Sequence, residues 1–334
     1  MLRRIATTVV TCLALAPAAG LAQQSYDLLI RGGRVLDGTG NPWYYADVAV
    51  SGDRIAAVGD LGNAQAHRVI DARGLYLAPG FIDVHSHAGP ALATPELSAA
   101  QPLLAEGVTT VVINPDGGGP VDLAAQKAAL LKDGLGVNVA QLVSHGAVRG
   151  AVLGMSDRAP SAAELDRMGQ LVQDGMEAGA FGLSSGPFYA PGSYATTEEL
   201  IELAKVAARY GGLYTSHIRD ESDYTIGVVA AVDEVIRISR EAGLPGIVSH
   251  IKVLGPHVWG YSLAVIQRIQ RARDEGLQVF ADQYPYDASS TSLTAALVPR
   301  WAQVGGDSAL QRRLATREER ERIRVEMVDN LDRR

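Results

Sequence analysis

The chain has 334 residues, of which 47% are hydrophobic and 20% charged, and its formal net charge is -7. This composition is that of an ordinary globular protein, so it excludes a largely disordered chain or a coiled coil. The acidic balance, with no basic cluster before the C-terminal segment, argues against nucleic acid as a partner, because phosphate contacts need Lys and Arg. At this length, one β/α barrel with a small accessory domain fits.

Residues 1–22 have the pattern of a secretory signal. Arg3 and Arg4 precede an apolar stretch over residues 5–15, and small residues up to Ala22 offer a cleavage site. The stretch is too short for a good membrane span, so we expect a periplasmic or secreted protein without membrane contact after cleavage. The one cysteine, Cys12, lies in this segment. Any metal in the mature chain must therefore be bound by His, Asp, Glu or a modified Lys.

Residues 23–78 are predicted to form a small β-sandwich part. Strand-like stretches occur at 27–31, at 47–50 with 55–58, and at 68–77, with turn residues at 32–33, 37–38, 51–52 and 71–74. This pattern of short strands and turns is distinct from the segment that follows.

Residues 79–305 alternate short apolar runs with helix-like segments, a pattern that predicts a parallel α/β fold. We count seven strand–helix units, whereas a complete (β/α)8 barrel has eight. The predicted strands are residues 81–84, 108–113, 137–143, 180–183, 213–215, 246–248 and 278–281. The clearest predicted helices are 162–178, 197–209 and 230–242, the second opened by a capping box of Thr196 and Glu199. Residues 306–334 are predicted to be a charged helical tail, its helix-like part starting at residue 310.

Most of the apolar runs are followed by a His or Asp. In a β/α barrel these strand ends form one rim, where active sites lie. His85 and His87 are two residues apart on an extended strand, so both can bind one metal ion. A second metal set would combine His217 and His250 with Asp116, although Asp116 can also be a turn residue in its glycine-rich loop. The residues at the rim are His85, His87, Asp116, His145, His217, His250 and Asp282.

Ser184 has the Gly-x-Ser-x-Gly spacing of a nucleophile elbow, between Gly182 and Gly186. Such an elbow leads from a strand into a helix, but Pro187 follows at once and prevents a helix there. We therefore interpret Ser184 as part of a glycine-rich strand end and expect metal-activated water as the nucleophile.

Seven segments of the chain resemble the N-acyl-D-amino-acid deacylases, or D-aminoacylases, of the amidohydrolase superfamily. They are residues 78–87, 106–112, 144–149, 181–186 with 189–197, 216–221, 249–252 with 255–260, and 282–286. The resemblance implies a barrel flanked by a small β-sandwich, and hydrolysis of N-acyl-D-amino acids to a carboxylate and a D-amino acid.

The resemblance also implies roles for individual residues. His217 and His250 would hold the main zinc ion, with His85 and His87 at a second, weaker metal position. Lys252, Tyr189 and Tyr284 would bind the carboxylate of a small anionic N-acyl amino acid, and a lysine suits that charge. Spacing alone leaves Tyr286 as an alternative to Tyr284.

The chain departs from the family in two ways. Asp116 stands where the best-known members carry Cys, and a bridging carboxylate favours a binuclear site. We expect one or two zinc ions, with Mn or Fe as alternatives. The chain also ends before the eighth strand, whose Asp shuttles the proton in the family. We therefore expect a C-terminal truncation, leave the catalytic base unassigned, and expect that truncation can impair activity.

Two other functions stay open. A related amidohydrolase could act on cyclic amides or dipeptides, since the fold alone does not fix the chemistry. A non-catalytic periplasmic binder of metal or ligand would show bound metal without turnover. The preferred enantiomer of the substrate, and a preference for cyclic or linear amides, would distinguish this first alternative from a deacylase.

Overall fold

The computed structural model describes residues 25–333. The chain divides into two compact units, the first ending at Pro79 and the second beginning at Gly80. The predicted signal segment, residues 1–22, lies outside the described residues. Each unit has its own hydrophobic clusters, so each is described separately.

The first unit is a five-stranded sheet arranged around its longest strand, β1. β1 pairs antiparallel with β2 and parallel with β4 and β5. Its buried residues include Leu29 and Ala49. The strands are β1 (Ser25–Val35), β2 (Tyr44–Ser51), β3 (Arg54–Gly59), β4 (Gln65–Asp71) and β5 (Tyr76–Leu77).

The predicted strand-like stretch over residues 68–77 is not continuous: the turn predicted at residues 71–74 divides it into β4 and β5. The Asp71 side chain accepts a hydrogen bond from the Arg73 backbone N–H, and Gly74 has a φ of +84°. Both features turn the chain before Tyr76, in keeping with the turn preferences of Asp and Gly.

The second unit contains parallel strands that follow one another in chain order. Two sheets have the orders β6-β7-β8 and β13-β12-β11-β10-β9. They are joined through Leu142, which stands between β8 and β9 and whose N–H donates to Ile113 O at 3.2 Å. The strands are β6 (Phe81–Ser86), β7 (Val108–Ile113), β8 (Asn138–Gln141), β9 (Val143–Ser144), β10 (Gly182–Ser185), β11 (Leu213–Ser216), β12 (Gly246–Val248) and β13 (Val279–Ala281).

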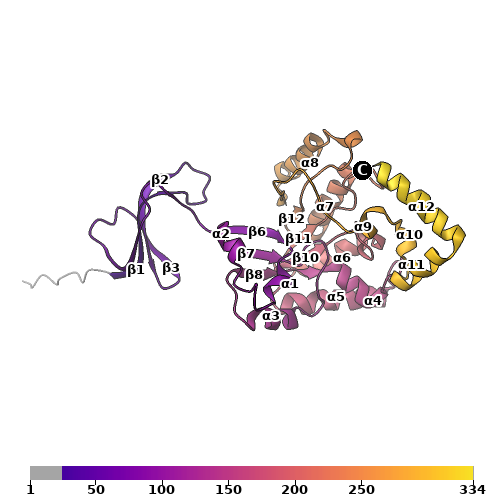
Figure 1. The fold of residues 1–334 in the computed structure, drawn as a ribbon, viewed down its shortest axis with the longest axis horizontal. Coiled ribbons are helices and arrows are strands. Elements are labelled where there is room, and N and C mark those ends of the chain that lie inside the picture. Colours follow the sequence, from indigo (N-terminus) through magenta and orange to yellow (C-terminus); the bar gives the residue numbers. More distant parts are fainter. Residues whose placement is uncertain (1–24, 334) are drawn as a thin grey trace, which may run out of the picture. The chain divides into compact units, whose positions relative to one another are not determined.

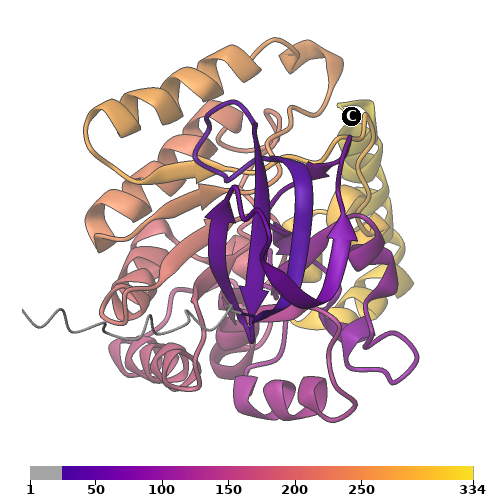
Figure 2. The same ribbon diagram turned by 90° about the vertical axis from the view of Figure 1, so that its left-hand side faces the viewer.

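Helices alternate with these strands and cover them on the outside. α5 packs against β9, α6 against β10 and β11, α7 against β12 and α8 against β13. Figure 1 labels these elements, and Figure 2 shows α5 to α8 side by side in chain order, from magenta to orange. The helices are α1 (Gly89–Leu92), α2 (Gln101–Ala105), α3 (Leu123–Leu131), α4 (His145–Leu153), α5 (Ala162–Glu177), α6 (Thr197–Ala208), α7 (Val228–Ala242), α8 (Ser262–Asp274), α9 (Leu293–Leu297), α10 (Arg300–Gln303), α11 (Gly306–Ala315) and α12 (Arg317–Asp332), with short 3-10 turns at Gly192–Tyr194 and Pro256–Val258.

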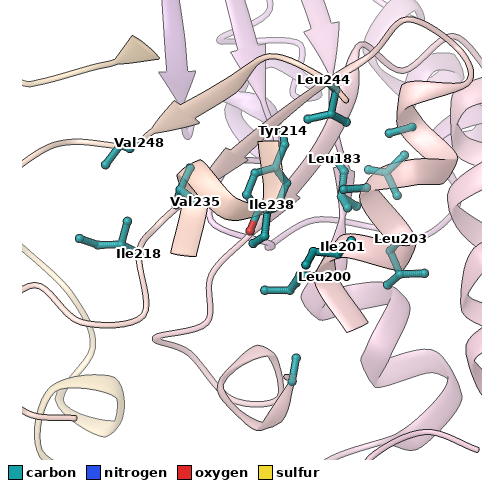
Figure 3. Close-up of a cluster of buried hydrophobic side chains, with 14 of the residues drawn as sticks. Leu183, Leu200, Ile201, Leu203, Tyr214, Ile218, Val235, Ile238, Leu244 and Val248 are labelled. Carbon is teal, nitrogen blue, oxygen red and sulfur yellow. The ribbon is translucent and has the colours of Figure 1, made fainter. Parts of the chain in front are cut away.

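The main core lies between the strands and α6 and α7. Leu183 and Tyr214 lie on β10 and β11, and they face Leu200 of α6 and Ile238 of α7 (Figure 3). All four are fully buried, and each buried apolar side chain contributes about 1.5–3 kcal/mol. This packing fixes the strands whose C-terminal ends carry the polar residues.

The predicted helix over residues 310–334 is two helices, α11 and α12, separated at Thr316, which has extended backbone. α12 is not wholly solvated, because Ile323 is 1% exposed and Glu326 accepts a hydrogen bond from Trp301 Nε1 at 2.9 Å. Nowhere in residues 25–333 is a helix both long and apolar enough to span a membrane.

Candidate metal centre

His85 and His87 lie at the end of β6 and face the same carboxylate. His85 Nε2 is 3.3 Å and His87 Nε2 is 3.2 Å from Asp116 Oδ2. The two-residue spacing on an extended strand places both imidazoles on one side, as the sequence predicts.

Asp116 is presented by a tight loop that follows β7. Asn114, Asp116 and Gly117 all have positive φ, at 65°, 57° and 69°. A Cβ on Gly117 would lie 2.9 Å from the Gly186 backbone nitrogen, so this loop needs a glycine where it passes the chain after β10. The loop thereby aims the Asp116 carboxylate toward the ends of the other strands.

His217 and His250 follow β11 and β12 and approach the other oxygen of Asp116. His250 Nε2 is 3.5 Å and His217 Nδ1 is 3.9 Å from Asp116 Oδ1, and the two ring centroids are 4.5 Å apart. His250 has a φ of +35°, a backbone conformation that is uncommon for residues other than glycine. Such strain persists where the surrounding structure holds it, most often at functional sites.

Burial and the neighbouring charges shift the pKa values of the residues in this cluster. Burial alone would raise the pKa of Asp116, but hydrogen bonds from His250, His85 and His87 outweigh it and hold that pKa far below its usual range. For His250, burial is likewise outweighed, by hydrogen bonds to Asp116 and Glu221, and its pKa rises to about 9. Burial lowers the pKa of His217 to about 3, so this ring is a neutral imidazole with a free lone pair.

The donor set fits a divalent metal ion. Ligand atoms of His85, Asp116 and His250 all lie within 4.8 Å of one another. Asp116 Oδ1, the oxygen that faces His217 and His250, is buried and has no hydrogen-bond partner. Buried polar atoms normally have one, and imidazole with carboxylate is a ligand combination that suits zinc and related ions.

The cluster lies in a pocket of about 940 Å³ whose lining includes Tyr189, Lys252 and Tyr284. Tyr189 OH is 3.4 Å from His217 Nδ1, and Lys252 Nζ is 5.5 Å from the centre of the Tyr284 ring. Tyr286 is 75% exposed, so Tyr284 is the tyrosine that faces the pocket. All three residues that the sequence assigned to substrate binding therefore border the cluster.

His145 does not join the cluster, although the sequence placed it on the rim. It begins α4 and is fully buried, with its Nε2 2.9 Å from Glu199 Oε1. The Glu199 side chain also accepts from Arg149, so the predicted capping box is only half formed: Thr196 accepts from the Glu199 N–H. The reciprocal box occurs instead at the start of α5, between Ser161 and Glu164.

Asp282 and Ser184 form hydrogen bonds with the backbone near the cluster. Asp282 Oδ1 accepts from the His250 backbone N–H at 2.5 Å, which helps to hold the strained conformation of that histidine. Burial raises the pKa of Asp282 despite this bond. Ser184 is buried and its Oγ donates to Asn114 O at 2.6 Å, as expected for a strand-end residue rather than a nucleophile.

Glu221 is a site residue that the sequence reasoning missed. It is 3% exposed, lines the pocket and lies 3.2 Å from His250 Nδ1. Burial alone would raise its pKa, but a hydrogen bond from His250 and the charge of Lys252 help to lower it to about 2. The sequence offered one indication of its role: Glu221 lies four residues after His217, within a segment (residues 216–221) that was named only for its resemblance to the family.

Parallel strands with covering helices, and a histidine–carboxylate cluster at the C-terminal strand ends, define the class of metal-dependent β/α-barrel hydrolases. Residues 68–322 match the model of the amidohydrolase family, so the chain belongs to that family. Its fold is the β/α-barrel type of the solved structures that it matches.

Relatives that match over most of the chain carry the names of deacylases or aminoacylases. The chain is 42% identical to an N-acyl-D-glutamate deacylase and 38% identical to a D-aminoacylase, both from Alcaligenes xylosoxydans xylosoxydans. Each match covers 81% of this chain and 59% of the relative, so the chain spans about three fifths of their length. A crystal structure of N-acyl-D-glutamate deacylase from Bordetella bronchiseptica, complexed with zinc and a phosphonate inhibitor, matches with a TM-score of 0.75 and 40% identity, over 82% of this chain and 62% of that chain.

Proposed function

We propose that the chain catalyses metal-dependent hydrolysis of the amide bond of N-acyl-D-amino acids, giving a carboxylate and a D-amino acid. The observation that supports this most is the convergence of four histidines on the two oxygens of Asp116, inside a pocket lined by Lys252. The names of the two Alcaligenes relatives, deacylases of D-amino-acid derivatives, support the substrate class.

The metal is proposed to be one or two zinc ions, with manganese or iron as alternatives. Asp116 with His217 and His250 would hold one ion, and His85 with His87 would hold a second that shares Asp116. When bound, such an ion polarises an amide carbonyl and lowers the pKa of a bound water. The zinc in the Bordetella structure supports this assignment.

The remaining pocket residues would orient the substrate. Lys252 Nζ and the hydroxyls of Tyr189 and Tyr284 can bind a carboxylate, which would place the neighbouring amide over Asp116 and its histidines. Burial raises the pKa of Tyr189 to about 12, so its hydroxyl remains a donor at neutral pH. An anionic N-acyl amino acid therefore matches both the charge and the donors of the pocket.

The test is an assay of free-amine release from N-acetyl-D-glutamate, N-acetyl-D-leucine and their L-enantiomers, with and without added zinc. We expect release from D-substrates that a chelator abolishes. His250→Gln should abolish it, whereas the matched control His257→Gln, which removes a 41% exposed imidazole paired with Asp223, should not. Hydrolysis of a cyclic amide instead would favour a different amidohydrolase reaction, and bound metal without any release would favour a non-catalytic binder.

We further propose that the protein is exported to the periplasm or secreted. The support is the sequence of residues 1–22: two arginines, a short apolar stretch and a small-residue cleavage site. N-terminal sequencing of the protein from a periplasmic fraction should begin just after Ala22. Recovery of the uncleaved chain from the cytosol alone would contradict export.

A further inference from the structure

Glu221 lies behind the two histidines, on the side away from Asp116. Its Oε1 is 3.2 Å from His250 Nδ1 and 3.7 Å from His217 Nε2. The opposite nitrogens of the same two rings, His250 Nε2 and His217 Nδ1, are the ones that face Asp116. One carboxylate thus faces the distal nitrogen of both rings.

The loop after β11 fixes Glu221 in this place. The Asp220 carboxylate accepts backbone N–H bonds from Ser222, Thr225 and Gly227 at 2.8, 2.5 and 3.0 Å. The Glu221 carbonyl accepts from the Leu254 N–H at 2.8 Å, and Ser222 Oγ donates to Leu254 O at 2.6 Å. These hydrogen bonds therefore fix the backbone that carries the Glu221 carboxylate, without a bound ligand.

We propose that Glu221 is a positioning residue of the metal centre, an inference that rests on the proposed metal-dependent function. Its carboxylate accepts the distal N–H of His250 at 3.2 Å and lies opposite the distal nitrogen of His217 at 3.7 Å, where its negative charge favours the proton on that nitrogen. With a metal ion bound, each ring would then present the lone pair of its other nitrogen to the ion on the Asp116 side. A ligating imidazole usually makes such a bond, because a proton on one nitrogen leaves the other free to bind metal.

Glu221 is a positioning residue rather than a metal ligand because of Lys252. His217, Glu221 and His250 are close enough to form a metal set of their own. However, Lys252 Nζ lies 2.5 Å from Glu221 Oε1 and 3.0 Å from His250 Nδ1. A metal ion on that side would face an ammonium at short range, and like charges repel strongly in a buried site. The Asp116 side offers a carboxylate and two more imidazoles instead.

The test measures metal affinity and the metal's spectrum. Co²⁺ and Zn²⁺ are titrated into the purified metal-free chain and into Glu221→Gln, with calorimetry for the affinity and visible absorption for the cobalt coordination. We expect about 10- to 100-fold weaker binding in Glu221→Gln, the usual effect of losing an outer hydrogen bond to a ligand. The cobalt spectrum should keep its shape, because no ligand is lost. Asp223→Asn, which removes an exposed carboxylate on the same loop, is the matched control and should bind like the unchanged chain.

A double variant distinguishes the effect of losing the Glu221 carboxylate from the effect of leaving the Lys252 charge without its partner. Glu221→Gln leaves the Lys252 charge beside His250, and that charge alone would weaken metal binding. In Glu221→Gln with Lys252→Met, no buried charge is left unpaired, so this variant also serves if the single one does not fold. Binding that stays weak supports the proposal.

Three results would overturn it: recovery of full affinity in the double variant, unchanged affinity in Glu221→Gln, or a cobalt spectrum that shows a lost oxygen ligand. Failure of the unsubstituted chain to bind metal would instead overturn the proposed function itself.

Discussion

At the scale of single residues, the site depends on backbone conformations that few side chains tolerate. Asn114, Asp116 and His250 are non-glycine residues with positive φ, and Gly117 completes the loop that carries Asp116. Holding a non-glycine residue there costs about 1–3 kcal/mol, so the surrounding packing must impose it. The position of the Asp116 carboxylate is therefore sensitive to the glycine beside it.

We expect Gly117→Ala to lower the free energy of unfolding by more than about 1 kcal/mol, because its φ is +69° and its Cβ would meet the Gly186 backbone. It should also reduce metal content, since the loop must shift. Gly118→Ala is the control: its φ is outside the left-handed region, and its Cβ would meet only Pro115 O at 3.7 Å. Urea denaturation and elemental analysis measure both effects, and equal behaviour of the two variants would contradict the argument.

Some of the individual site residues could be predicted from the sequence and others could not. His85, His87, His217 and His250 were found because each follows an apolar run, and the barrel brings such positions together. Glu221 was missed because it lies five residues beyond its strand, where the Asp220 turn decides its direction. His145 was misplaced because it begins a helix, which turns its ring away from the rim toward Glu199.

At the scale of elements, Glu199 joins α6 to α4. It is 3% exposed in the first turn of α6 and accepts from His145 and Arg149, and Arg149 is fully buried. Burial alone would raise the pKa of Glu199, but these bonds lower it below its ordinary value of 4.5. The stability that Glu199 contributes is then present above about pH 4.5, and it is lost as the pH falls through the lower pKa of the folded state.

Glu199→Gln should reduce the free energy of unfolding at pH 7 by about 3–5 kcal/mol, because it leaves the Arg149 guanidinium buried without its charge partner. It should also flatten the loss of stability in acid. Glu202→Gln on the same helix removes an exposed carboxylate paired with Lys205, so a change within about 0.5 kcal/mol is expected. Urea denaturation between pH 3 and pH 7 compares them. Parallel pH curves for the two variants would contradict a special role for Glu199.

Elements were predicted well where hydrophobic periodicity decides them. α5, α6 and α7 lie within a few residues of their predicted bounds, because each buries one apolar face against the sheet. The turn at Asp71–Gly74 was predicted, although the strand was drawn through it, and the break between α11 and α12 was missed. In each case a local turn, at Asp71–Gly74 or at Thr316, interrupts an otherwise continuous pattern.

At the scale of the whole molecule, a bound metal would connect strands that are far apart in the sheet order. His85 lies at the end of β6, whereas His217 and His250 follow β11 and β12, and the Asp116 carboxylate lies between these histidines. An ion held by these groups binds only when the strand ends are assembled. It therefore favours the folded second unit over its unfolded state.

Metal should accordingly protect the second unit from unfolding. At an ion concentration of about 100 times Kd, the linkage amounts to about 2.7 kcal/mol, and a chelator should remove it. Hydrogen-exchange mass spectrometry should then show slower exchange for peptides of both β7 and β12 when zinc is added. His217→Gln should lose this effect, while His257→Gln, whose imidazole pairs with Asp223 outside the cluster, should keep it. Protection confined to β12 would mean that the ion is held without Asp116, since Asp116 is the proposed ligand that follows β7, in the other sheet.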